Sequence, residues 1–177
     1  MSSTPIYRLE AKRPKLHPTV WVAPGASVVG DVEIGEGSGI WFGCVLRGDT
    51  NFIRVGARTN IQDGSILHVA RQTIPCIVGD DVTIGHGAIV HACTIEDGGF
   101  VGLGAIIMDG AVIETGGMLA AGALLPPGKR IGTRELWKGN PAKFARILTD
   151  EDVAHNDAGT AHYVELAARY RADFGAT

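Results

Sequence analysis

The sequence lacks three features that would each assign it to a broad class of protein. It has no apolar run near the roughly 18 residues that suggest a membrane-spanning helix, and its start, MSSTPIYRLEAKRPKLHP, has no apolar signal segment. It has no excess of basic residues, because 16 Lys and Arg stand against 19 Asp and Glu. Binding to nucleic acid or to anionic membranes is therefore not expected. We expect one cytoplasmic domain over residues 1–177.

Paired cysteines are also missing. The three cysteines are odd in number and form no C-x-x-C motif, which argues against a disulfide framework and against a thiolate zinc site. We expect Cys44, Cys76 and Cys93 to be small buried residues. Glycine, in contrast, is abundant: its 25 residues are about twice the usual share of roughly 7%. A chain of this composition turns often.

Aliphatic residues recur every six positions. An amphipathic helix would repeat them every three or four residues and a half-buried strand every two, so neither fits. A parallel β-solenoid does fit, because each hexapeptide then forms one side of a triangular coil and its aliphatic residue points inward. The repeat predicts an all-β solenoid of nearly six coils over about residues 16–137. The seventeen positions are Val22, Val28, Ile34, Ile40, Leu46, Val55, Ile61, Leu67, Val78, Ile84, Val90, Ile95, Val101, Ile107, Ile113, Leu119 and Leu125.

A helix is predicted after the solenoid, over about residues 149–174. Thr149 can cap it, and the acidic residues that follow favour the first turn of a helix. Gly159 is expected to divide it into two pieces. We expect the helix to pack along the prism or against a neighbouring subunit. Its apolar stripe consists of Tyr163, Leu166, Ala167, Tyr170 and Phe174.

The repeat breaks where residues are inserted, and insertions in a solenoid usually form loops on one face. The two long ones, RGDTNFIR and HVARQTIPCI, are expected to protrude. By the repeat register, Arg47, His68 and His91 follow core residues on the same side of successive coils. His68 and His91 should therefore stack about 4.8 Å apart. Two imidazoles at that spacing can bind one metal at about 2.0–2.1 Å.

His86 belongs to a different side of the prism, at the position that Asp63 occupies one coil earlier. It cannot stack on the other two histidines. If two prisms pack side by side, however, His86 of one chain can face His68 and His91 of the next. Three subunits are the natural closure for such a heterologous contact. The sequence thus predicts a site shared between the chains of a homotrimer.

Two segments, RGDTNFIRVGARTNIQDGSILH and VGDDVTIGHGAIVHACTI, resemble the γ-class carbonic anhydrase family, and the resemblance extends over roughly residues 10–170. It implies a left-handed parallel β-helix of hexapeptide repeats with a C-terminal α-helix. It also implies that a homotrimer binds Zn²⁺, or Fe²⁺ or Co²⁺, at its subunit interfaces and hydrates carbon dioxide to bicarbonate. The implied metal ligands are His68, His86 and His91.

The resemblance also assigns roles to residues around the metal. Arg47 and Asp49 would form an interfacial ion pair, and Gln62 would hydrogen-bond water or substrate, with Asn60 and Asp63 beside it. Tyr163 is a further candidate from the helix. Acidic residues that move protons in active members are absent here: Thr50 takes one place, and the segment with Arg71 takes the other. The sequence therefore favours metal binding over fast turnover.

Other functions of a hexapeptide-repeat protein stay open. An acyltransferase would use a single histidine base and bind acyl-coenzyme A in the groove between prisms. A thioesterase or another metallohydrolase could use the same metal, because a metal-activated hydroxide also attacks thioesters. A metal-binding scaffold with little activity is the last alternative, since fold does not fix function.

Overall fold

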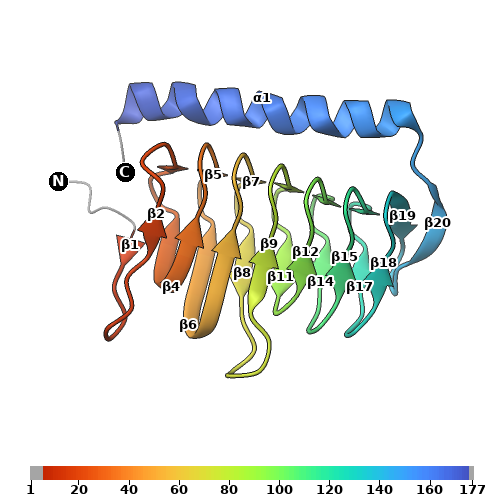
Figure 1. Cartoon of the computed structure of the whole chain (residues 1–177), viewed down its shortest axis with the longest axis horizontal. Helices are drawn as coiled ribbons and strands as arrows, with labels where there is room; N and C mark the ends of the chain where they lie inside the picture. Colours follow the sequence, from red (N-terminus) through yellow and green to blue (C-terminus); the bar gives the residue numbers. More distant parts are fainter. Residues whose placement is uncertain (1–5, 176–177) are drawn as a thin grey trace.

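The computed structural model describes residues 6–175 and shows a three-sided prism of short stacked strands with one helix along it (Figure 1). All strand pairs between coils are parallel, and the only antiparallel strand pair in the described residues lies at the C-terminal end of the prism. The predicted fold class, a parallel β-solenoid followed by a C-terminal helix, is confirmed. No helix in the described residues is both long and apolar enough to cross a membrane.

Each face of the prism is one column of strands. The first face contains β3 (Trp21–Val22), β5 (Gly39–Ile40), β7 (Asn60–Ile61), β10 (Thr83–Ile84), β13 (Phe100–Val101), β16 (Met118–Leu119) and β19 (Glu135–Lys138), and ends with antiparallel β20 (Lys143–Ile147). The second contains β1 (Ile6–Tyr7), the first parts of β4 (Ser27–Ile34) and β6 (Val45–Val55), β8 (Ile66–His68), β11 (Ile89–His91), β14 (Ile106–Ile107) and β17 (Leu124–Leu125). The third contains β2 (Lys15–Leu16), the second parts of β4 and β6, β9 (Cys76–Val78), β12 (Thr94–Ile95), β15 (Val112–Ile113) and β18 (Arg130–Ile131).

The core is the column of aliphatic side chains inside the prism. All seventeen positions of the six-residue repeat are buried, as are the three cysteines. Burial of one such side chain contributes about 1.5–3 kcal/mol. At the two ends of the prism, Leu16, Ile131 and Trp137 continue the register of the seventeen positions, within the predicted bounds of about residues 16–137.

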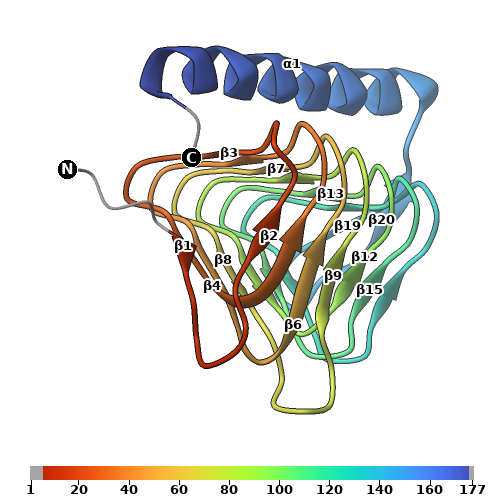
Figure 2. The ribbon, with the colours of Figure 1, turned by 60° about the vertical axis from the view of Figure 1, so that its left-hand side comes forward.

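The helix α1 (Asp150–Phe174) runs back along the first face from the C-terminal coil toward the N-terminal one (Figures 1 and 2). Its predicted stripe packs on the prism: the Tyr163 ring meets Trp41 at 5.2 Å between centroids, and the Tyr170 ring meets Trp21 at 5.0 Å. The prediction that Gly159 divides the helix is wrong, because α1 is continuous. A helical glycine costs about 1 kcal/mol relative to alanine, and packing on the prism offsets that cost.

The start of α1 is fixed by a capping box. The Thr149 hydroxyl accepts a hydrogen bond from the Asp152 amide, and the Asp152 carboxylate accepts one from the Thr149 amide. Arg146 Nη2 lies 3.0 Å from Asp152 Oδ1. The hydrogen bond from Arg146, followed by those from Thr149, lowers the pKa of Asp152 below its ordinary value.

This cap should make stability depend on pH. A carboxyl whose pKa is lower in the folded state stabilises the protein above its unfolded pKa, about 3.9 for aspartate, and loses that contribution as the pH falls. We expect the thermal unfolding midpoint of the wild type to exceed that of Asp152→Asn at pH 7. The gap should narrow at pH 3, in thermal melts followed by circular dichroism. An equal difference between the two unfolding midpoints at pH 7 and at pH 3 would contradict this role of the cap.

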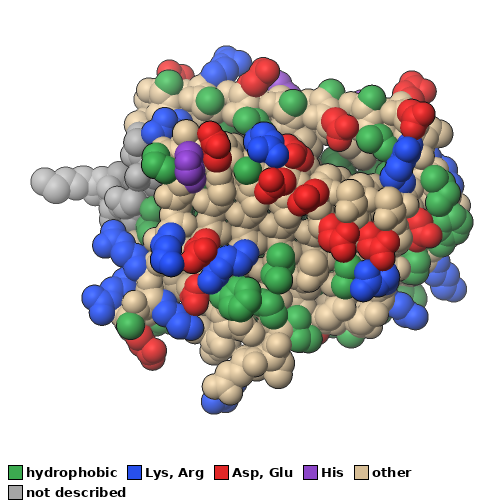
Figure 3. All heavy atoms as spheres, in the orientation of Figure 1, with side chains coloured by type: hydrophobic (Ala, Val, Ile, Leu, Met, Phe, Trp, Pro, Cys, Tyr) green, Lys and Arg blue, Asp and Glu red, His purple; other side chains and the backbone are tan. Residues whose placement is uncertain are grey.

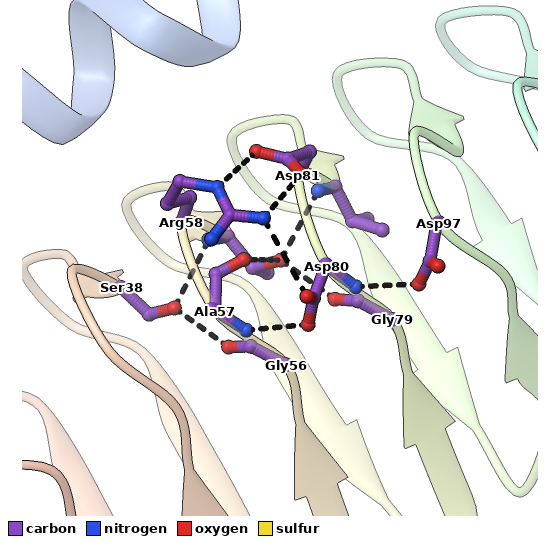
Figure 4. Close-up of polar contacts among 10 residues, drawn as sticks. Ser38, Gly56, Ala57, Arg58, Gly79, Asp80, Asp81 and Asp97 are labelled. Carbon is purple, nitrogen blue, oxygen red and sulfur yellow. Dashed lines mark hydrogen bonds and ion pairs between the residues drawn. The ribbon is translucent and has the colours of Figure 1, made fainter.

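Corners between the third and first faces are held by side chains that reach between adjacent coils (Figure 4). Arg58 donates to both carboxylate oxygens of Asp81, at 2.7 and 2.6 Å. The amide of Ala57 donates to Asp80 Oδ1 at 2.8 Å, and the amide of Asp80 donates to Asp97 Oδ1 at 2.8 Å. These carboxylates thus satisfy backbone amides where the chain turns.

Glycine is required where coils lie closest. A Cβ on Gly102 would lie 2.3 Å from the amide nitrogen of Ala121 in the next coil, so no larger residue fits without moving the backbone. Gly87 and Gly104 instead adopt positive φ at turns, at 68° and 64°, a conformation that glycine enters without strain. Close stacking and tight turns together explain the high glycine content.

The two long insertions differ in structure. The second, between β8 and β9, forms the loop that projects below the prism (Figure 1). The first does not protrude as a loop, contrary to the prediction. It remains part of β6, which pairs with β4 on both sides of a register shift near Gly30. Pairing with β4 holds the ends of the insertion, Gly48 and Ile53, while residues 49–52 between them have no partner in β4.

Candidate metal centre

Two predicted site histidines stack on the second face. His68 at the end of β8 is the register partner of His91 at the end of β11, and Arg47 in β6 is the partner of His68 on the other side. The register predicted from the repeat is therefore confirmed. His68 Nδ1 and His91 Nε2 face each other at 3.2 Å.

The outer nitrogen of each ring is held by a carboxylate. His68 Nε2 lies 3.1 Å from Asp49 Oδ1, and His91 Nδ1 lies 2.6 Å from Asp109 Oδ1. Because an ionised carboxylate only accepts hydrogen bonds, each outer nitrogen is the one that carries the ring proton. In the neutral form, the two nitrogens that face each other then present lone pairs. Two lone pairs at this distance repel unless a cation lies between them.

The distance between these two nitrogens fits a shared metal ion. Two nitrogen ligands at about 2.0–2.1 Å from a tetrahedral zinc lie roughly 3.3 Å apart, close to the 3.2 Å found here. A carboxylate behind each histidine is the usual outer partner of a histidine that binds a metal. The donor set and its support therefore fit a metal such as zinc.

Asp49 connects the histidine pair to Arg47. The Arg47 guanidinium forms an ion pair with Asp49, and the Thr50 amide donates to Asp49 Oδ1 at 2.7 Å. Burial raises the pKa of the Asp49 carboxyl, but hydrogen bonds from Thr50, Arg47 and His68 outweigh it and lower the pKa to about 2. Asp49 is thus a carboxylate at neutral pH, ready to hold His68.

His86 lies elsewhere in the same chain, just after β10 at the corner between the first and second faces. Its Nδ1 is 2.9 Å from Asp63 Oδ2, and its Nε2 is 3.3 Å from the Tyr163 hydroxyl. Burial, followed by the nearby charge of Asp63, raises the pKa of Tyr163, so the phenol stays protonated. With Nδ1 held by Asp63, Nε2 keeps a lone pair, which accepts a hydrogen bond from the Tyr163 hydroxyl and is the one that a metal would take.

Gln62 and Asn60 form a buried polar pair beside this corner. Gln62 Nε2 donates to Asn60 Oδ1 at 3.1 Å, and Asn60 Nδ2 donates to Thr83 Oγ1 at 2.8 Å. The side-chain oxygen of Gln62, Oε1, is therefore the atom of this amide that can accept a further hydrogen bond. A cavity of about 170 Å³ between α1 and the first face is lined by Gln62, Tyr163 and Gly159, among others.

A single chain brings together only part of the predicted site. His68, His91, Asp49 and Arg47 form one group, while His86, Asp63 and Tyr163 form another. In the part of the chain that the structure describes, no group of three or more His, Cys, Asp or Glu side chains is placed to hold a metal ion within one subunit.

Asp109 was not predicted. It lies in the next coil, one residue beyond the position that the register Val90–Ile107 pairs with His91, so neither the sequence spacing nor a local motif indicated it.

The outer surface of the second face carries an apolar row next to the histidines. Its members are register partners in successive coils, and Ile66 and Ile89 are 41% and 40% exposed. α1 covers the first face, and charged side chains of both signs spread below it (Figure 3). The corresponding third-face row is polar or charged at most positions, for example Glu33, Arg54 and Arg130. We call Val45, Ile66, Ile89, Ile106 and Leu124 the second-face ladder.

Comparisons of the sequence with known proteins give related results. The model of the bacterial transferase hexapeptide family (six repeats) matches residues 13–48. Gamma carbonic anhydrase 2, mitochondrial, from Arabidopsis thaliana is 52% identical over 161 residues, which are 88% of this chain and 58% of that protein. The chain thus spans about three fifths of the length of the plant relatives. A carbonic anhydrase from Geobacillus kaustophilus is 40% identical over 94% of this chain and 91% of its own length.

A solved structure agrees with the fold over almost the whole chain. The crystal structure of a putative acetyltransferase from Bacillus cereus is 41% identical, with a TM-score of 0.93, and covers 94% of this chain and 96% of that one. The protein from Geobacillus and this structure both match nearly end to end. The agreement therefore includes the solenoid and α1 together.

Proposed function

The chain belongs to the γ-class carbonic anhydrase-like family of hexapeptide-repeat proteins, and from this premise we propose that it is a metal-dependent carbonic anhydrase. The observation that carries the proposal is the facing pair His68 and His91 at 3.2 Å, each with a carboxylate on its outer nitrogen. A single histidine base, as an acyltransferase needs, would not require this arrangement.

The proposed metal ligands are His68 Nδ1 and His91 Nε2 of one subunit and His86 Nε2 of a neighbouring one. Zn²⁺ is the proposed metal, with Fe²⁺ or Co²⁺ as alternatives, and when bound it supplies hydroxide at neutral pH for attack on carbon dioxide. Neutral imidazoles are needed for this, and Asp49 holds Nε2 of His68 while Asp63 holds Nδ1 of His86.

A homotrimer would complete the site. The second-face ladder leaves a row of aliphatic side chains in water beside two of the three ligands, and a neighbouring subunit would bury it. If that subunit contributes its first-to-second corner, it brings His86 to the open side of the pair. The same contact repeated around a threefold axis gives three equivalent sites.

Gln62 and Tyr163 would act on the substrate side. Asn60 holds the amide nitrogen of Gln62, so the Gln62 carbonyl oxygen can accept a hydrogen bond from water or product. The Tyr163 hydroxyl can donate beside His86. Thr50 and the segment with Arg71 take the places where the family resemblance implies acids that transfer protons, so buffer would take up the proton. We therefore expect slow turnover that rises with buffer concentration.

The experiment compares two reactions on one sample. The full-length protein is prepared anaerobically, and its carbon dioxide hydration is followed by stopped flow beside the hydrolysis of an acyl-coenzyme A thioester. Hydration that disappears with a chelator and returns with the metal supports the proposal. Thioester hydrolysis with the same metal dependence and no hydration would instead favour the thioesterase. A protein that holds its metal but is inactive in both reactions would favour the metal-binding scaffold.

We also propose a cytoplasmic location.

A further inference from the structure

Asp109 lies in the coil that follows that of His91, in the turn at the end of the second face, immediately after Met108. The coil is fixed at this point, because Val90 and Ile107 are register partners and the Gly110 amide donates to the carbonyl of Ala92 at 2.7 Å. Asp109 Oδ1 is therefore held 2.6 Å from His91 Nδ1 by the backbone of two adjacent coils. The two side chains are 44% and 35% exposed.

The two carboxylates behind the histidines differ in their own partners. Asp49 shares its charge between Arg47, the Thr50 amide and His68. Among the described residues, the ion pair to His91 is the only one that Asp109 forms. The negative charge of Asp109 therefore acts on His91 without compensation by a neighbouring cation, while that of Asp49 is largely neutralised.

We propose that Asp109 is a positioning residue that fixes the tautomer of His91 and strengthens it as a metal ligand. The inference rests on the proposed metal site. Because Asp109 accepts the proton of His91 Nδ1, the Nε2 lone pair points at His68 Nδ1. An uncompensated carboxylate also increases the electron density that the ring donates. Of the two stacked histidines, His91 is then the stronger ligand.

The test measures metal affinity on the intact protein. Zinc is titrated in competition with a chromophoric chelator into wild type, Asp109→Asn and Asp109→Glu. Asparagine keeps the shape of the side chain and removes its charge, so zinc affinity should fall about 10–100-fold. Glutamate restores the charge and should recover part of the loss. The control Asp157→Asn makes the same chemical change at an exposed position of α1, outside the proposed metal site, and should bind zinc as the wild type does.

A second measurement does not depend on any variant. Nitrogen-15 NMR of the imidazole rings in the zinc-loaded wild type should show the His91 proton on Nδ1. Equal zinc affinity of Asp109→Asn and wild type, or a His91 proton on Nε2, would overturn the inference and leave the proposed function intact. A wild type that binds no zinc would overturn both. If Asp109→Asn does not fold, the NMR result and Asp109→Glu decide.

Discussion

Replacement of His91 with alanine is expected to remove the metal while the prism stays folded. His91 supplies one of the two nitrogens that face each other at 3.2 Å, and without it His68 is the only ligand that this chain contributes to that site. The His91 side chain is 35% exposed and lies outside the core, so its loss leaves no large cavity. Elemental analysis of anaerobically prepared protein should fall from a full complement of metal per subunit to almost none, and carbon dioxide hydration should fall to background.

The matched control is His17→Ala. His17 is an exposed histidine whose Nδ1 contacts the Thr19 hydroxyl at 2.9 Å, away from the second face. This variant should keep its metal. If His91→Ala retains as much metal as the control, His91 is not a ligand. If both variants keep their thermal unfolding midpoint, the difference in metal content comes from the site and not from the fold.

Replacement of Ile89 with glutamate is expected to dissociate the proposed trimer. Ile89 lies in the middle of the second-face ladder, between Ile66 and Ile106. A charge in the centre of a buried contact has no partner, and burying an unpaired charge costs several kcal/mol. Analytical ultracentrifugation should show a monomer in place of a trimer. Metal should be lost as well, because separated subunits cannot bring His86 to the histidine pair.

The third face offers a control for this change. Ile77 in β9 is 36% exposed, and it precedes its core residue just as Ile89 does, but it lies between Arg54 and Thr94. Ile77→Glu should leave both trimer and metal intact. A wild-type monomer, or a trimer that tolerates glutamate at position 89, would show that the second face is not the interface.

The repeat made most of the fold predictable. One aliphatic residue every six positions can be buried only if the chain turns every six positions, and all seventeen of these residues are inside. The same register placed His68 beside His91, although 23 residues separate them. Position in the coil thus replaces distance along the sequence as the measure of which residues meet.

The remaining features depend on contacts outside the repeat. Gly159 stays helical because the prism supports α1, which local propensity does not show. The first insertion stays within β6 because β4 pairs with Gly48 and Ile53 at its two ends. Asp109 was missed because it forms part of no local motif with His91. Its role appears only when adjacent coils are superimposed.

The course of α1 has a consequence for how the chain unfolds. Stacked repeats ordinarily interact only with their nearest neighbours, so they can open one by one from an end. Here the Trp21 ring of the first full coil packs against Tyr170, close to the end of the helix. The helix thereby ties the first full coil of the prism to the segment that follows its last coil. The first coil therefore cannot open without releasing the C-terminal half of the helix.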